Sequence, residues 1–385
     1  MSSTPATASS RHAPRAQEEL SAVLREAGED GASVRFRGGG TKFHWGAAAA
    51  DPDVELSTLG LDRIVEHNEG DLTAVVEAGA RFASMQEGFA SAGQMLALDP
   101  PLGEDSSATI GGVVATADSG PLRHRYGSVR DLVVGMTVAL SDGTVSKSGG
   151  KVIKNVAGYD LAKLFTGAYG TLGAILQVAV RLHPLPPRTA TAVGVSDDPA
   201  ALAAAANELT HARLELQSLD LGWQDGQGAV MARLGGATVA DAAAEVAGLL
   251  SRHGLQTSVD EDDEALWDGA RAAQRSREGI VVRVSGVQDQ TAALLERARE
   301  LDAGLVTRAA FGLSWITVAD GDAVESLRRT LAPSPCVILD APAVKREALD
   351  VWGPQDPGAL ALMKRVRERF DPAGACASGL LSGVG

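Results

Sequence analysis

The sequence predicts an α+β protein of two or three domains. Its 385 residues exceed the ~100–200 residues of a common single domain. Between residues 16 and 186, short strand-like and helix-like segments alternate around clusters of glycine. From 188 to about 340 these clusters are absent, and the order strand, helix, strand, strand, helix occurs twice. That order is typical of an antiparallel sheet covered by helices on one face.

The glycine-rich part begins with a strand at 33–37, where polar and apolar residues alternate. A second strand is expected at 71–77. Apolar residues at helical spacing predict a helix at 81–92. Residues 133–145 predict a hairpin with a tight turn at Asp-Gly, and 172–182 predict a closing strand rich in apolar residues.

The sequence HPLPP at 183–187 ends this part and predicts a domain boundary. The expected divisions are a flexible tail at 1–15, then 16–186, 187–340 and 341–385.

The second part predicts an antiparallel sheet with helices. Its expected strands lie near 190–195, 213–222, 228–234, 280–285, 303–310 and 313–319, and its helices near 199–210, 238–251, 289–301 and 321–331. The acidic run at 260–264 is interpreted as a solvated loop rather than a metal site. One further helix is predicted near 357–370.

The composition excludes several classes of function. A net charge of −14 argues against nucleic acid, which is bound through cations, but not against a nucleotide held by backbone N–H groups. No apolar stretch approaches the ~18 residues of a membrane span, and no secretory signal is visible, so we expect a cytoplasmic protein. Cys336 and Cys376 are too few for a zinc or iron–sulfur site, so we expect no metal and two buried thiols.

Three glycine-rich segments carry the chemistry. Arg37-Gly38-Gly39-Gly40-Thr41-Lys42 follows a strand and is either a nest of N–H groups for a diphosphate or a flexible turn. Ser107 to Gly112, preceded by Asp-Pro-Pro, and Gly167 to Ile175 each suggest backbone packed against a flat ligand, or a turn. Three such segments within 150 residues predict a long cofactor.

The ordered series RGGGTK, DPP…SATIGG, SDG and GKVIKNVAGYDLAKLFTGAYGTLGAI resembles the PCMH-type FAD-binding domain of the vanillyl-alcohol oxidase superfamily. The resemblance covers about 16–186 and returns near the C-terminus. It implies two α+β subdomains with FAD between them, an α+β cap domain with an antiparallel sheet at 187–340, and a C-terminal segment packing back on the FAD domain. The stretch KNVAGYDLAKLFTGAYGTLG and the ending FDPAG carry a narrower resemblance, to the E subunits of glycolate oxidase.

The resemblance also implies a set of FAD-binding residues. They are Arg37, Gly38, Gly39, Gly40, Thr41 and Lys42 around the diphosphate, with Pro101, Ser107, Thr109, Gly111, Gly112, Ser119, Gly120, Gly170, Gly173 and Ile175. Relatives that link the flavin covalently through the first loop have a histidine where this chain has Thr41, so noncovalent FAD is expected.

The catalytic group is less defined. His44, Lys154 and Tyr159 are candidates for the catalytic group, and the alternative for each is a structural role. Trp45 either covers the flavin or simply packs. Arg123, His124 and Arg125 are interpreted as a solvated basic turn.

The chain departs from catalytic relatives in its C-terminal half. No histidine follows His253, and the asparagine and arginine of the family ending FDPxGxLNPGR are replaced by Ala377 and Leu380.

The expected function is therefore the FAD-binding subunit of a glycolate oxidase, a 2-hydroxy-acid dehydrogenase complex. Its flavin would accept a hydride or relay electrons, with a paralogous flavoprotein and an iron–sulfur subunit as partners and peripheral membrane contact through them. The alternatives are a stand-alone hydroxy-acid or alcohol oxidase, and a scaffold that has lost FAD.

Overall fold

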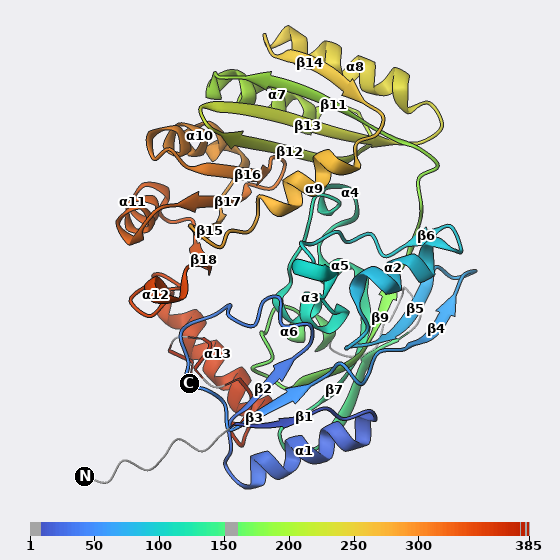
Figure 1. Ribbon diagram of the computed structural model, residues 1–385, viewed down its shortest axis with the longest axis vertical. Helices are drawn as coiled ribbons and strands as arrows, with labels where there is room; N and C mark the ends of the chain where they lie inside the picture. Colours follow the sequence, from blue (N-terminus) through green and yellow to red (C-terminus); the bar gives the residue numbers. More distant parts are fainter. Residues whose placement is uncertain (1–8, 151–160, 378, 382, 385) are drawn as a thin grey trace.

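The computed structural model describes residues 9–150, 161–377, 379–381 and 383–384. These residues form a mixed α and β structure, so the predicted fold class is confirmed. Two small layers built on the N-terminal residues lie below one large sheet of the central residues, and the C-terminal helices run down one side (Figure 1).

The first layer is a parallel three-stranded sheet in the order β1-β3-β2. Its strands are β1 (Ser10–His12), β3 (Val54–Ser57) and β2 (Val34–Arg37). Helix α1 (Gln17–Glu29) buries Leu20 and Leu24 against it. The predicted strand at 33–37 is β2, and it leads directly into the first glycine-rich segment.

The second layer is an antiparallel five-stranded sheet in the order β4-β5-β9-β7-β8. Its strands are β4 (Ile64–Asn68), β5 (Thr73–Glu77), β9 (Ala174–Arg181), β7 (Val133–Ala139) and β8 (Val145–Gly149). The accompanying helices are α2 (Phe82–Ala90), α3 (Ile110–Thr116), α4 (Arg123–Tyr126), α5 (Val129–Leu132) and α6 (Leu161–Phe165). The predicted helix at 81–92 and the hairpin at 133–145 are confirmed.

The central residues form an eight-stranded antiparallel sheet, which we call the cap sheet, in the order β14-β11-β13-β12-β16-β17-β15-β18. Its strands are β11 (Thr189–Ser196), β12 (Leu216–Gln224), β13 (Gln227–Gly235), β14 (Gln256–Asp260), β15 (Ile280–Ser285), β16 (Gly304–Arg308), β17 (Leu313–Val318) and β18 (Cys336–Asp340). Helices α7 (Pro199–His211), α8 (Val239–Arg252), α10 (Thr291–Glu300) and α11 (Gly321–Leu331) bury apolar side chains in one core with this sheet. The predicted strand and helix order is confirmed.

The opposite face of the cap sheet is turned toward the N-terminal layers. Val281, Val306 and Trp315 from this face share a core with Trp45, which follows the first glycine-rich segment. Helix α9 (Glu264–Ala272) lies at this junction, near α4 (Figure 1). Trp45 therefore packs between the two parts and also lines a cavity next to the first glycine-rich segment, so both alternatives drawn from the sequence stay open.

One sequence-based interpretation holds only in part and another is wrong. In the acidic run at 260–264, residues 261–263 form a turn between β14 and α9 with Glu261 and Asp262 exposed, but Asp263 is 3% exposed. Arg233 forms an ion pair with Asp263 at 2.7 Å and orients its carboxylate. The solvated basic turn is wrong for Arg123 and His124, since Arg123 is half-buried over the ring of Phe311 at 5.7 Å.

The C-terminal residues lie against the N-terminal layers. Helix α13 (Pro357–Phe370) follows the short α12 (Ala343–Arg346) and brings Phe370 to 5.5 Å from the ring of Phe165. The carbonyl of Ala375 then accepts a hydrogen bond from the N–H of Val34 at 2.7 Å. Cys336 and Cys376 are free and buried, as predicted.

Candidate functional site

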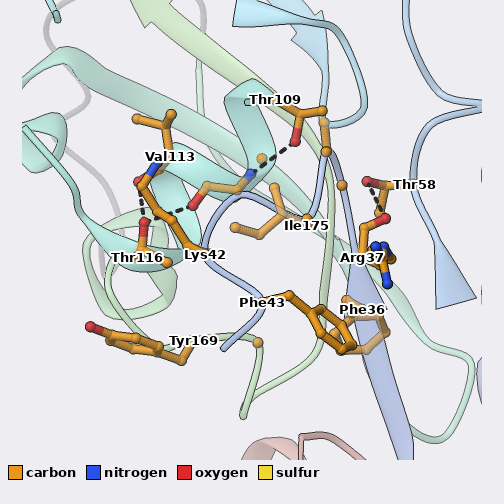
Figure 2. A pocket seen from close by; sticks show the side chains of 18 of the residues that line it. Phe36, Arg37, Lys42, Phe43, Thr58, Thr109, Val113, Thr116, Tyr169 and Ile175 are labelled. Carbon is orange, nitrogen blue, oxygen red and sulfur yellow. Dashed lines mark hydrogen bonds between the residues drawn. The ribbon is translucent and has the colours of Figure 1, made fainter. Parts of the chain in front are cut away.

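Two adjoining cavities lie where the glycine-rich segments meet. The first is narrow and runs between β2, α3 and residues 169–175. The second is roomier, with about 1090 Å³ against about 120 Å³, and lies between residues 98–107 and the cap-sheet side. Residues 39–41 line both. In Figure 2, labelled side chains from β2, α3 and all three glycine-rich segments surround the first cavity.

Gly38 and Gly39 allow two of these segments to touch. A Cβ atom on Gly38 would lie 2.2 Å from the Thr109 hydroxyl, and one on Gly39 would lie 1.7 Å from the carbonyl oxygen of Ser107. Both distances are far below van der Waals contact, so no larger residue fits there without moving the chain. The glycines are thus required first by the contact between the two segments, and that contact fixes the wall of the first cavity.

The loop of residues 37–42, which we call the glycine loop, offers unused backbone donors. No acceptor among the described residues takes a hydrogen bond from the N–H groups of Gly38, Gly39, Gly40 or Thr41. Half-buried donors of this kind need a partner, which an anion can supply. Arg35 and Arg37 also line the cavity and add positive charge.

The second glycine-rich segment contributes in another way. The N–H of Gly111 donates to the carbonyl of Ala78 at 2.8 Å, and the N–H of Gly112 donates to the Thr109 hydroxyl at 3.3 Å. These donors are therefore already paired inside the protein. Gly111 and Gly112 line the first cavity as bare backbone and leave room for a ligand, without offering it an N–H group.

Lys42 closes the inner end of the glycine loop. Its ammonium group lies 3.1 Å from the carboxylate of Asp118 and donates to the carbonyl of Pro101 at 3.2 Å. Burial lowers the pKa of Lys42, although the charge of Asp118 acts in the opposite direction. Lys42 thus ties the loop to the end of α3 and to residue 101.

The third glycine-rich segment has an unusual backbone. Tyr169 has a φ angle of +56°, in the left-handed region that non-glycine residues rarely adopt, and Gly170 follows at +75°. Both line the first cavity together with Gly173 and Ile175. The hydroxyl of Tyr169 is buried and has no hydrogen-bond partner among the described residues.

Asp340, at the end of β18, links the glycine loop to the cap sheet. Its carboxylate accepts hydrogen bonds from the Trp45 indole N–H at 2.9 Å and from Arg275 at 2.7 Å, and it lies 2.8 Å from the His44 Nε2. Burial acts to raise the pKa of Asp340, but His44 and Arg275 outweigh it and hold that pKa well below the ordinary value. Arg275 also donates to the carbonyl of Thr41 at 3.2 Å. Sequence reasoning missed Asp340 and Arg275, because neither stands in a recognisable motif.

The second cavity has charged walls. Three arginines, Arg271, Arg275 and Arg277, face it, and Arg271 lies 3.5 Å from Asp99. Burial raises the pKa of Asp99 to about 6, against the opposing charge of Arg271. His44 lines this cavity and is 47% exposed in its side chain.

The structure brings together most residues that the sequence singled out. The first cavity is lined by Arg37, Gly38, Gly39, Gly40, Thr41, Lys42, Thr109, Gly111, Gly112, Gly170, Gly173 and Ile175, and the second by Pro101, Ser107 and His44. Ser119 and Gly120 line neither. Ser119 instead accepts a hydrogen bond from Gln274, and Gly120 packs against the Asp99 backbone. Lys154 and Tyr159 lie outside the described residues.

Among the described residues, no group of three or more histidine, cysteine, aspartate or glutamate side chains could hold a metal ion. No helix in the same part of the chain is long and apolar enough to cross a membrane.

Comparison with known protein families agrees with this geometry. Residues 11–149 match the family model described as FAD binding domain. The resemblance drawn from the glycine-rich segments is confirmed for this part of the chain.

Relatives with curated descriptions extend the likeness. The chain is 34% identical over 203 residues to glycolate oxidase subunit GlcD of Bacillus subtilis, covering 52% of this chain and 43% of that protein. It is 40% identical over 124 residues to glycolate oxidase subunit GlcE of Escherichia coli, covering 32% and 35%. It is 34% identical over 180 residues to the mitochondrial D-lactate dehydrogenase (cytochrome) of Arabidopsis thaliana, covering 47% and 31%. These matches span less than half the length of each relative.

A solved structure of alkyldihydroxyacetonephosphate synthase has a similar fold, with a TM-score of 0.71 at 15% identity. The match covers 95% of this chain and 75% of that one, so it includes the cap sheet as well as the N-terminal layers.

Proposed function

We propose that this chain, whose residues 11–149 match an FAD-binding family model, binds FAD noncovalently in the first cavity and is an oxidoreductase acting on a small 2-hydroxy acid. The observation that carries the proposal is the row of unused N–H groups from Gly38 to Thr41, which lies where three glycine-rich segments meet. A diphosphate is the anion for which such a row of donors is suited.

The residues present fit FAD. Gly38 to Thr41 would hold the diphosphate, with Arg35 and Arg37 offsetting its charge. The bare backbone of Gly111, Gly112 and Gly173 would admit a flat ring, and Ile175 would lie against it. When bound, FAD supplies the two-electron oxidation and reduction chemistry.

Thr41 occupies the position at which covalently flavinylated relatives have a histidine. The nearby His44 has one ring nitrogen engaged with Asp340 and lines the second cavity. This arrangement supports noncovalent binding, and acid precipitation tests it. Flavin should be released into the supernatant, whereas yellow colour retained in the pellet would contradict the proposal.

His44 is the group best placed to accept the hydroxyl proton of the substrate. Asp340 contacts its Nε2 at 2.8 Å, which orients the ring and leaves Nδ1 as the nitrogen available for a proton. The three arginines of the second cavity are each ion-paired with carboxylates that line the same cavity.

The narrower proposal is a cytoplasmic FAD subunit of a glycolate-oxidase-type complex, with a paralogous flavoprotein and an iron–sulfur subunit as partners. It is supported by the identity to GlcE and by Ala377 and Leu380, which replace the asparagine and arginine of the family ending. The alternative is a stand-alone hydroxy-acid dehydrogenase, favoured by the roomy second cavity that His44 lines.

An absorption spectrum of the purified chain, taken with and without added FAD, tests the proposal. We expect oxidised flavin bands that are lost on anaerobic addition of dithionite. Bleaching by glycolate or D-lactate would establish the stand-alone dehydrogenase. A yellow protein unchanged by either acid would favour the dependent subunit, and a chain that stays colourless with FAD would contradict the proposal.

A further inference from the structure

Strand β14 is an open edge of the cap sheet. It is the outermost strand and lies at the end of the sheet farthest from the N-terminal layers (Figure 1). On one side it pairs with β11 through all five of its residues, from Gln256 to Asp260, without a register shift. No other described residue forms a hydrogen bond with the backbone of this strand. Its outer side therefore presents unpaired N–H and C=O groups, which form a template for another strand.

The residues of β14 do not protect this edge. Gln256, Thr257, Ser258 and Val259 are all exposed, and Val259 is 40% exposed although it is apolar. The strand contains no lysine or proline, the residues that commonly block pairing at an exposed edge. Its one charged residue, Asp260, stands at its end. The strand is thus suited to pairing along its whole length.

Other sheet edges of the molecule carry such protection. At the opposite edge of the cap sheet, β18 is buried, and the N–H of Ile338 donates to the carbonyl of Val351 at 2.8 Å. In the five-stranded sheet, the edge strand β4 has a register shift between Ile64 and Glu66, and the edge strand β8 has an exposed Lys147. Burial, register shifts and edge lysines all prevent unwanted pairing. Among these four strands, β14 alone has none of them, which points to a partner for it.

The sequence of β14 is compatible with a second copy of itself. In an antiparallel pair with a two-fold axis at Ser258, the two Ser258 residues face each other, Thr257 faces Val259, and Gln256 faces Asp260. Thr257 and Val259 are β-branched, which favours strands, and no like charges meet. An axis two residues closer to the C-terminus would instead place Asp260 opposite Asp260, so the acidic residue selects the register.

The two ends of β14 carry opposite charges. Glu261 and Asp262 follow the strand and are exposed, and Asp262 has no ion-pair partner among the described residues. Arg252, at the end of α8, and His253 precede the strand, and the Arg252 side chain is 66% exposed. Because antiparallel strands place the start of one beside the end of the other, the acidic turn of each copy would lie beside Arg252 and His253 of the other. This charge complementarity applies twice in a symmetric pair.

We propose that two copies of this chain associate through β14, which joins their cap sheets into one continuous sheet across a two-fold axis at Ser258. The contact is isologous, since the same strand serves both copies. Main-chain hydrogen bonds supply the affinity, and the flanking charges fix the register. The inference goes beyond the proposed function and does not depend on it, because no residue of β14 lines either cavity.

Sedimentation equilibrium of the purified full chain tests the inference. We expect the wild type to have twice the mass of one chain. Ser258→Lys and Ser258→Glu each place two like charges at the axis, on an exposed position where the fold tolerates them. Each variant should dissociate at least about tenfold more readily, equal to about 1.4 kcal/mol. An equimolar mixture of the two variants should recover the dimer, because the introduced charges are then opposite.

Val65→Lys is the matched control, since Val65 is 50% exposed on the edge strand β4 and the substitution adds the same charge. It should leave the dimer unchanged. A monomeric wild type would overturn the inference and leave the edge to a strand of a different protein. Dimers of equal strength in the wild type and both Ser258 variants would overturn it as well, because the copies would then associate elsewhere. Failure of the mixture to recover the dimer would overturn the axis at Ser258.

Discussion

The glycine loop offers backbone N–H groups to the first cavity, whereas the cap sheet offers the side chains of Asp220, Arg283 and Arg308 to the junction. A backbone donor does not depend on the identity of a side chain. The backbone must, however, follow a path on which any residue larger than glycine would clash. A charged side chain on a buried strand needs neighbours that hold it. The comparison teaches that the two sides of the junction should respond differently to substitution, as the following predictions specify.

The largest effect is expected from Gly39→Ala. The new Cβ would lie 1.7 Å from the Ser107 carbonyl, so the glycine loop must move away and its N–H row is displaced. Overpacking of this kind costs about 1–3 kcal/mol or more. We expect FAD affinity, followed by fluorescence titration, to fall at least about a hundredfold, which corresponds to about 2.7 kcal/mol.

Gly248→Ala is the control for this substitution. Gly248 lies in α8 with nothing within 4 Å of its Cβ position, so alanine should stabilise the helix slightly and leave FAD binding unchanged. Equal FAD affinity in both variants would contradict the distinction drawn above, in which the glycine loop contributes backbone N–H groups and the cap sheet contributes side chains.

Asp340→Ala is expected to have the next largest effect, this time on stability. It removes the partner of Arg275, Trp45 and His44 and leaves a partly buried guanidinium group unpaired. Removing one member of a buried ion pair costs about 3–5 kcal/mol. Urea denaturation should show this loss, while Asp197→Ala, at an exposed site, should change little. A small effect of Asp340→Ala would mean that the glycine loop does not depend on the cap sheet.

Asp99 should make stability depend on pH in a particular direction. Burial raises its pKa to about 6, so the folded protein holds this proton more tightly than the unfolded chain does. Stability should therefore fall as pH rises from about 4 to about 6, by about 1–3 kcal/mol at most. Asp99→Asn should make this slope shallower in denaturation curves measured across that range, while Asp220, whose pKa burial raises to about 7, still contributes a slope of the same sign. An unchanged slope would contradict the assignment.

The smallest effect is expected from Phe370→Leu, which keeps an apolar side chain and removes the edge-to-face contact with Phe165 at 5.5 Å. Such contacts contribute about 0.5–1.5 kcal/mol. Thermal melting should show a loss of this size, whereas Leu362→Ala, more than half exposed on the same helix, should show almost none. Equal losses would mean that α13 is not held by its aromatic contact.

The N-terminal half of the site could be predicted from the sequence because glycine clusters are visible as clusters. The hairpin, β2 and the strand and helix order of the cap sheet followed from periodicity. The charged residues of the cap sheet could not be found in this way. Asp220, Arg283 and Arg308 are single charges in three separate apolar strands, and only the sheet register brings them together. Strand β14 and helix α9 were missed because the acidic run suggested solvent, although Arg233 pairs with Asp263.

The C-terminal segment has a consequence for how the molecule is made. Leu380 lines the first cavity, and the carbonyl of Ala375 bonds to Val34 on β2. Residues nearly 350 positions apart in the chain thus complete one wall. During synthesis the N-terminal layers leave the ribosome long before residue 380, so the wall is finished only after residue 380 has been made. Cofactor retention in the cell should therefore require the chain through residue 380, and a fragment ending before residue 375 should lose bound flavin readily.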